Sequence, residues 1–172
     1  MEKSSVEAIV EALNAAQVRY LVAGGLAVVA HGYVRFTADV DLILDLEQAN
    51  LIRAIGALSR LGYRPRAPVA FEDFGDPGKR AEWIRDKGMT VFSLYSPAHP
   101  MTEVDLFVEP PLDFDAAYRE SAKRELAPGQ VATFVGFEDL IRLKQKAARP
   151  QDVLDIERLR ALEKRQNDER ET

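Results

Sequence analysis

The sequence contains no cysteine and no long hydrophobic run, and each absence excludes a class of chemistry or location. Without cysteine the 172-residue chain has no disulfide, no thiolate zinc site and no thiol nucleophile, so any catalysis must use oxygen, nitrogen or a metal ion. No run of about 18 apolar residues and no basic-then-apolar leader is present, so we expect neither a membrane span nor secretion. We therefore predict a cytoplasmic protein.

Histidine and net positive charge are also scarce. The chain has two histidines, and its 28 acidic residues outnumber 23 basic ones, which gives a formal net charge of −5. Binding to bulk duplex DNA depends on neutralising many phosphates with Lys and Arg, so this balance argues against it and favours a small or structured partner. With 47% hydrophobic residues, a chain of this length can build one domain core, with room for a small helical appendage.

Aspartates are present in two apolar stretches. Asp39 and Asp41 are separated by Val40, and Asp105 stands in a second apolar stretch at 102–108. Side chains alternate along a strand, so Asp39 and Asp41 share one face while their apolar neighbours fill the other. The same alternation puts Asp105 on the polar face of its own stretch. If the two strands are neighbours, the three carboxylates meet.

Three carboxylates in one place repel one another unless a cation lies between them. At about 4 Å and an effective dielectric of about 20, each like-charge pair costs roughly 4 kcal/mol. Divalent cations remove that repulsion, and hard oxygen ligands without His or Cys suit Mg²⁺ or Mn²⁺ better than zinc. We therefore predict a Mg²⁺ or Mn²⁺ site at Asp39, Asp41 and Asp105. A solvated Asp-x-Asp at a strand end is the simpler alternative, but it leaves Asp105 without a role.

Apolar spacing and turn residues predict alternating helices and strands. The expected helices cover residues 5–16, 26–31, 47–61, 113–124, 137–148 and 151–165. The expected strands cover residues 18–23, 38–44, 63–71, 90–95, the stretch around Asp105, and 131–135. The 90–95 strand should return antiparallel, through the turn at 96–100, into the Asp105 strand. Together these elements predict an α/β (α+β) fold with a small mixed β-sheet flanked by helices and a C-terminal helical pair.

Capping residues and composition suggest several boundaries. Ser4 and Glu7 fit a capping box for the first helix, and Asp45 is the expected N-cap of the helix at 47–61. The stretch 72–78 has the acidic, Gly and Pro content of a mobile loop. The apolar residues expected to face inward from the 47–61 helix are Leu51, Ile52, Ile55 and Leu58.

A glycine pair before the two aspartates completes a known order of motifs. Gly24-Gly25 opens a short helix, Asp-x-Asp follows on the next strand, and a lone Asp comes on a later strand. In this order the chain resembles the nucleotidyltransferase superfamily, which shares the DNA polymerase beta type of catalytic fold. It looks like the branch of small prokaryotic members that includes antibiotic nucleotidyltransferases and AbiEii-type toxins. The narrower similarity is carried by residues 21–27, by Arg35-x-Thr37-x-Asp39-x-Asp41, and by the stretch from Asp139 through Lys144 to Asp155.

The resemblance implies an activity and a set of site residues. The activity is metal-dependent transfer of a nucleoside monophosphate from an NTP to an acceptor hydroxyl, with release of pyrophosphate. The implied catalytic and metal-binding residues are Asp39, Asp41 and Asp105, and the implied nucleotide-binding residues are Gly24, Gly25, Arg35, Thr37 and Lys144. Residues 1–136 would form the catalytic domain and 137–165 a helical pair packed on it, while 166–172 would be a polar tail that frays.

The residues support part of this on physical grounds and leave alternatives open. A glycine pair lets backbone N–H groups approach phosphate oxygens at a helix N-terminus, although Gly24-Gly25 alone is more often just a strand-to-helix turn. Arg35 and Thr37 are also explained as surface residues before the strand. Lys144 is also explained as part of a solvated helix face, so its nucleotide-binding role rests on the resemblance.

The acceptor and the class of function stay open at this level. An aminoglycoside or lincosamide hydroxyl, a tRNA 3′ end and a protein Tyr or Ser hydroxyl need the same three acids, and the toxin branch adds an antitoxin as a candidate partner. A metal-dependent glycosyltransferase also uses Asp-x-Asp, but it gives no reason for the glycine pair or for Asp105. A noncatalytic nucleotide-binding or toxin-neutralising protein would keep the fold without turnover, and the presence of all three acids weakens that alternative.

Overall fold

A seven-stranded β-sheet organises the protein, whose computed structural model describes residues 1–170. The strands are β1 (Tyr20–Val22), β2 (Asp39–Leu44), β3 (Arg64–Pro65), β4 (Val91–Tyr95), β5 (Glu103–Phe107), β6 (Ala122–Ala127) and β7 (Gln130–Phe134). The helices are α1 (Lys3–Ala15), α2 (Gly24–Ala30), α3 (Gln48–Arg60), α4 (Pro77–Lys87), α5 (Phe114–Arg119), α6 (Phe137–Ala147) and α7 (Pro150–Arg170), with the 3-10 helix η1 (Phe71–Gly75).

The sheet is mixed, with the strand order β3-β4-β5-β2-β1-β7-β6. The β2–β5 and β1–β7 pairs are parallel, and the other four pairs are antiparallel. The antiparallel return of β4 into β5 confirms the predicted hairpin. With helices α6 and α7 following the last strand, the predicted α/β class, the mixed sheet and the C-terminal helices are confirmed.

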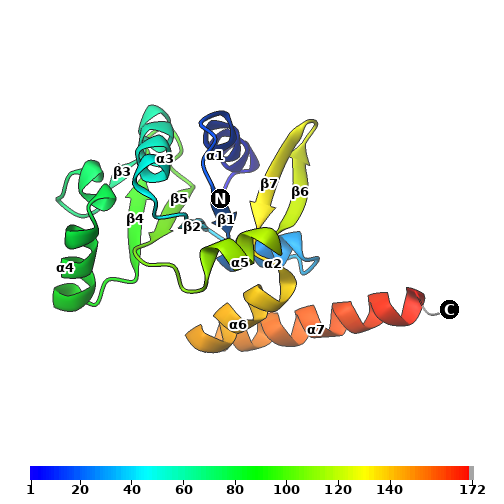
Figure 1. Ribbon diagram of the computed structural model, residues 1–172. Helices are drawn as coiled ribbons and strands as arrows, with labels where there is room; N and C mark the ends of the chain where they lie inside the picture. The colour runs from blue at the N-terminus through cyan, green and yellow to red at the C-terminus, as the bar shows by residue number, and fades with distance from the viewer. Residues whose placement is uncertain (171–172) are drawn as a thin grey trace.

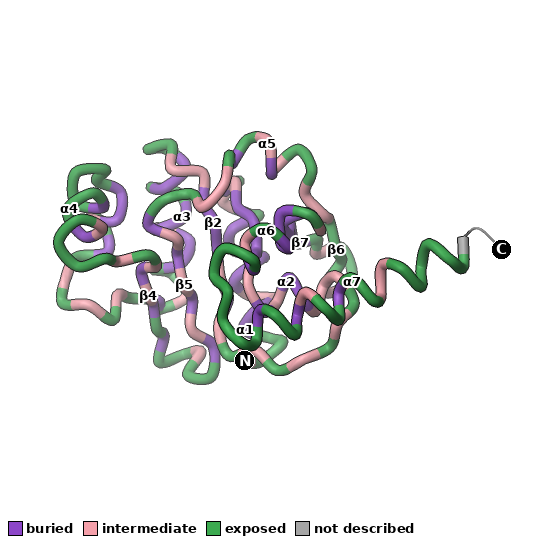
Figure 2. Tube along the Cα trace, turned by 90° about the horizontal axis from the view of Figure 1, so that it is seen from below, coloured by how far each residue is buried: buried purple, intermediate pink, exposed green. Residues whose placement is uncertain are grey.

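Helices α1 and α3 pack against each other and against the sheet because each carries one apolar face. In α1 this face is formed by Val6, Ile9, Val10 and Leu13, all buried. Figure 1 shows α1 and α3 together at the top of the view, with α6 and α7 at the bottom. In Figure 2 the buried positions follow the central strands and the neighbouring helices. The sheet therefore lies in the core of the molecule.

Helices α6 and α7 pack on each other, and α6 also contacts α2. The second half of α7 extends beyond the rest of the molecule in both views (Figures 1 and 2). The last helix was expected to end at residue 165 and residues 166–172 to fray, but α7 continues to Arg170. Residues 171–172 of the expected tail lie outside the described part of the chain. No helix within residues 1–170 is long and apolar enough to cross a membrane.

The stretch 72–78, expected to be a loop, is instead η1 followed by the start of α4. Phe71 and Phe74 are buried, and both lie against Phe92 of β4, which explains why this stretch is ordered against the sheet. Asp76 caps α4 by accepting from the N–H groups at positions 78 and 79, and Pro77 stands at the first helical position. The Asp-Pro pair is therefore a helix start.

The helix expected at 113–124 ends at Arg119, and residues 122–127 form β6. Strand β6 pairs antiparallel with β7 through the turn at Gly129, whose φ of 76° lies in the left-handed region that glycine tolerates. The first part of the expected helix is present, and its residues Phe114 and Ala117 are both buried. The pairing with β7 decided the conformation that follows.

Two expected helix caps and one expected core residue are wrong. Helix α1 begins at Lys3, so Ser4 lies inside the helix and the capping box does not form. Helix α3 is capped by Glu47, whose side chain accepts from the N–H groups of residues 49 and 50, while Asp45 accepts from the N–H of Glu47. Ile52 is 62% exposed, because the buried face of α3 contains Ala54 and Ala57 and does not include Ile52.

Candidate metal centre

The candidate site lies where β2 and β5 run side by side in parallel. The register pairs Asp41 with Asp105 and Asp39 with Glu103. Residues that pair across two strands point to the same face of the sheet, so the register brings Asp41 and Asp105 together. Strands β2 and β5 are therefore neighbours, which is the condition for the predicted meeting of the three carboxylates.

The alternation along both strands separates a polar face from a buried one. Val40, Leu42, Val104 and Leu106 are fully buried on one face. Asp39, Asp41 and Asp105 are half-buried on the other, and one carboxylate oxygen from each lies within 4.8 Å of the others. Three carboxylate oxygens at this spacing suit a hard divalent cation. Metal binding at this cluster stays a prediction.

The acidic cluster is electrostatically unfavourable on its own. Burial, reinforced by the charges of Asp39 and Asp105, raises the pKa of Asp41 to about 6. Burial also raises the pKa of Asp105, against the opposing effect of a hydrogen bond from Ser93 of β4. The distant charges of Arg149 and Lys144 lower the pKa of Asp41 without offsetting these causes. The site therefore holds more negative charge than its surroundings balance.

Gly24 lets the start of α2 pack directly against this carboxylate cluster. Its φ is 58°, and a Cβ placed there would lie 1.8 Å from Oδ2 of Asp41. The N–H of Ala23 donates to the backbone oxygen of Asp41 at 2.9 Å, which holds the end of β1 against β2. A side chain at position 24 would displace Asp41, so the glycine is required by both conformation and space.

Gly25 lies beneath two polar side chains from the segment between α2 and β2. A Cβ at Gly25 would lie 2.5 Å from Oγ1 of Thr37 and 2.7 Å from Nη2 of Arg35. Thr37 also donates to Oδ1 of Asp39 at 3.2 Å. The predicted nucleotide-binding residues Gly24, Gly25, Arg35 and Thr37 are thus next to one another and to the acids. These two side chains fill the space directly over Gly25, so a phosphate bound there would contact Arg35 and Thr37.

Lys144 differs from the solvated lysine that the helix pattern suggested. Its side chain is 4% exposed, and its Nζ lies 2.9 Å from Oδ1 of Asp152 and 2.6 Å from Oδ2 of Asp155. Lys144 therefore binds two carboxylates of α7. Direct binding of a nucleotide by Lys144 stays a prediction.

Sequence analysis assigned no role to Asp152 or Asp155, yet both are buried next to the site. Asp155 also pairs with Arg35, and Asp152 pairs with Arg149, whose charge acts on Asp41. Their spacing in the sequence could have indicated this burial, because both acids share the inner face of α7 with Leu159. An acid on the apolar face of a helix requires a cationic partner.

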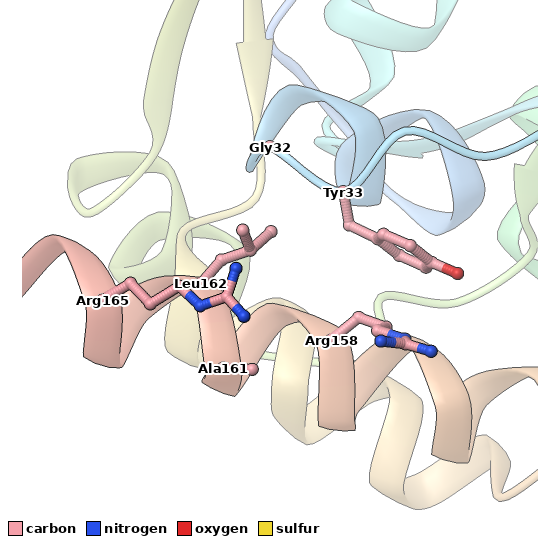
Figure 3. Close-up of a pocket in the computed structure, with 6 residues that line it drawn as sticks. All are labelled: Gly32, Tyr33, Arg158, Ala161, Leu162 and Arg165. Carbon is pink, nitrogen blue, oxygen red and sulfur yellow. The ribbon is translucent and has the colours of Figure 1, made fainter.

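A separate hollow of about 350 Å³ lies between the end of α2 and α7. Its lining residues are Gly32, Tyr33, Arg158, Ala161, Leu162 and Arg165. Figure 3 shows Tyr33 above Arg158, with Leu162 pointing from α7 toward the backbone at Gly32. None of the three clustered aspartates lines this hollow, so it is a different surface from the candidate metal centre.

No protein-family model matches the sequence, and no curated protein matches it closely enough to count as similar.

Proposed function

We propose that this protein is a metal-dependent nucleotidyltransferase that moves a nucleoside monophosphate from an NTP to an acceptor hydroxyl. One observation carries the proposal: Asp39, Asp41 and Asp105 bring carboxylate oxygens within 4.8 Å of one another on adjacent parallel strands. The same place contains Gly24, packed against Asp41, and the Arg35 and Thr37 side chains. This arrangement follows the motif order of the nucleotidyltransferase superfamily that the sequence resembles.

The donor set fits Mg²⁺ or Mn²⁺. All three ligand groups are carboxylates, and neither histidine belongs to the cluster. The pKa of Asp41 is raised first by burial and then by the charges of Asp39 and Asp105, and a divalent cation would neutralise those charges. When bound, such a cation supplies charge neutralisation on the triphosphate and polarises the acceptor hydroxyl.

The residues of the chain then suit the parts of a phosphoryl-type transfer. The acceptor oxygen forms a bond to the α-phosphorus, the bond from that phosphorus to the bridging oxygen breaks, and pyrophosphate leaves. Asp105 takes the proton of the acceptor hydroxyl, since it is the carboxylate of the cluster proposed to lie on the acceptor side. Asp39 and Asp41 hold the metal and fix the geometry.

The nucleotide is proposed to bind with its phosphates over Gly25. Arg35 supplies positive charge there, and Thr37 supplies a hydroxyl that already contacts Asp39. Backbone N–H groups in the first turn of a helix have no partner within the helix, so those of α2 add donors. These groups contact phosphate and not base, so the proposal makes no choice among ATP, GTP, CTP and UTP.

The acceptor is proposed only as a hydroxyl, on a small molecule such as an antibiotic, on a tRNA 3′ end or on a protein side chain. The resemblance to the AbiEii-type branch adds a toxin role with an antitoxin partner as one form of this proposal. All these acceptors use the same three acids, so the chemistry of the site supports the reaction type and not the acceptor.

The test is pyrophosphate release by the full chain with Mg²⁺, each of the four NTPs and pools of the three acceptor types. Metal-dependent release that disappears with EDTA is the expected result. Binding of NTP·Mg²⁺ without release in any pool would replace the proposal with a noncatalytic nucleotide-binding or toxin-neutralising protein. Binding of a nucleotide sugar in preference to every NTP would favour a glycosyltransferase.

A further inference from the structure

A chain of buried charged groups connects the C-terminal helices to the segment 33–38 beside the metal centre. Asp155 of α7 is fully buried and lies between two cations. Its Oδ2 is 2.6 Å from Nζ of Lys144, and its Oδ1 is 3.1 Å from Nε of Arg35. Gln151 also donates to Oδ1 of Asp155 at 3.0 Å. Asp155 thus forms ion pairs on both sides, and its hydrogen bond among the described residues comes from Gln151.

Arg35 is held at two of its three nitrogens. Nε lies against Asp155 as an ion pair without hydrogen-bond alignment, and Nη1 donates to the backbone oxygen of Phe36 at 2.8 Å. Nη2 lies over Gly25 and has no acceptor among residues 1–170. The guanidinium thus presents its third nitrogen toward the proposed phosphate position.

The segment 33–38 is arranged to present Arg35 inward. Val34 and Phe36 are 82% and 80% exposed, whereas Arg35 and Thr37 point toward Gly25. The segment has no helix or strand of its own, so its backbone is not fixed by regular hydrogen bonding. The contact between Arg35 and Asp155 ties it to α7.

We propose that Asp155 is a positioning residue, which acts through Arg35 to present Nη2 to the triphosphate of the nucleotide. The proposal rests on the proposed function, since it needs a phosphate ligand over Gly25. A long arginine side chain loses rotamer freedom when it binds a ligand, and a partner that already holds it in place removes much of that cost. The C-terminal helices would thereby determine nucleotide affinity without contacting the nucleotide.

Asp152 provides a matched control. Like Asp155, it is a buried aspartate of α7 that pairs with Lys144, but its second partner is Arg149 at 2.8 Å and not Arg35. Asp155→Asn and Asp152→Asn each remove one carboxylate from Lys144. Only Asp155→Asn also removes the anion beside Arg35.

The experiment is calorimetric titration with Mg²⁺ and α,β-methylene-ATP, whose α–β bridge cannot be cleaved. Asp155→Asn should raise the Kd about tenfold, whereas Asp152→Asn should stay within about twofold of the wild type. Arg35→Ala alone should raise the Kd about tenfold, and adding Asp155→Asn to it should change the Kd no further. This non-additivity is the sign that Asp155 acts through Arg35.

A structural role alone would give a different pattern. Equal weakening by Asp155→Asn and Asp152→Asn, or equal weakening with and without Arg35, would overturn the proposal. If Asp155→Asn fails to fold, Arg35→Lys keeps a positive charge beside Asp155 but has one nitrogen in place of three. That nitrogen cannot contact Asp155 and a phosphate over Gly25 together, so a tenfold weaker Kd is expected and an unchanged Kd overturns the proposal.

A second measurement separates this inference from the proposed function. Hydrogen exchange of the backbone at 33–38, followed without nucleotide, should be faster in Asp155→Asn than in Asp152→Asn. Unchanged exchange there would overturn the positioning role. If the wild type binds none of the NTPs, the proposed function and the triphosphate ligand both fall, while faster exchange would still support the hold of Asp155 on Arg35.

Discussion

The protein gathers aspartates in two places, and the two groups differ in how their charge is balanced. In the metal centre, Asp39, Asp41 and Asp105 face one another, and within residues 1–170 no Lys or Arg forms an ion pair with any of them. In the C-terminal cluster, Asp152 and Asp155 share Lys144. Arg149 pairs with Asp152 and Arg35 pairs with Asp155, so three cations face these two carboxylates.

The difference is visible in the protonation behaviour of single groups. Burial raises the pKa of Asp41 to about 6, and the negative charges of Asp39 and Asp105 act in the same direction. Burial acts in the same direction on Asp152, but hydrogen bonds from Arg149 and Lys144 outweigh it and lower its pKa. A balanced cluster stabilises the fold as it stands. The unbalanced cluster is the one for which we propose a metal ion from solution.

The largest expected effect is on activity, through Asp41→Ala. Loss of this proposed metal ligand should lower metal-dependent transfer on the order of 10⁴-fold, which corresponds to about 5 kcal/mol. The fold should persist, and metal-free stability should rise because the like-charge repulsion is relieved. Pyrophosphate release and thermal unfolding check the two halves, and undiminished turnover would remove Asp41 from the mechanism.

Asp105→Asn serves as the comparison for that variant. It should also lower the rate strongly, since the proton acceptor is lost. It should retain more NTP binding than Asp41→Ala, because Asp105 is proposed to act on the acceptor side. Equal loss of NTP affinity in both variants would assign Asp105 to the nucleotide instead.

Breaking the balanced cluster should cost stability. Lys144→Met leaves two buried carboxylates without their shared cation, which should lower the free energy of unfolding by about 3 kcal/mol. Lys146→Met is the control, since Lys146 is exposed on the same helix and its loss should change stability by less than about 0.5 kcal/mol. Chemical denaturation measures both, and equal stabilities would show that the cluster does not stabilise the fold.

The unbalanced cluster should respond to pH. In metal-free protein, folded Asp41 holds its proton up to about pH 6, whereas an unfolded aspartate releases it near pH 4. Its contribution to stability is therefore present below about pH 4 and is lost as the pH rises to about 6, by an amount on the order of 2 kcal/mol. Asp41→Asn should remove this slope, and saturating Mg²⁺ should remove it in the wild type.

The smallest expected effect is at Gly25. Gly25→Ala places a Cβ against Thr37 and Arg35 and should weaken binding of NTP·Mg²⁺ about tenfold, by a similar factor for all four bases. Gly56→Ala on α3 is the matched control, since its Cβ would meet only Nη1 of Arg60 at 3.5 Å. That substitution should leave affinity unchanged. A loss confined to one base would contradict the phosphate assignment.

The two aspartate clusters also differ in how far the sequence predicts them. The acidic face of β2 and β5 followed from the period-2 alternation, which local sequence displays directly. The strand β6 and the salt-bridged Lys144 did not follow, because both depend on partners distant along the chain. Helix α4 was missed for another reason. Its Asp76-Pro77 start reads as a turn unless the cap is recognised.

The parallel pairing of β2 with β5 has a consequence for the folding pathway. These strands are adjacent in the sheet, yet α3, β3, η1, α4 and β4 lie between them in the chain. Closing so long a connection is entropically costly, so this contact is expected to form late. The complete set of metal ligands then exists only in the native state. Mg²⁺ should accordingly slow unfolding while leaving the rate of folding almost unchanged.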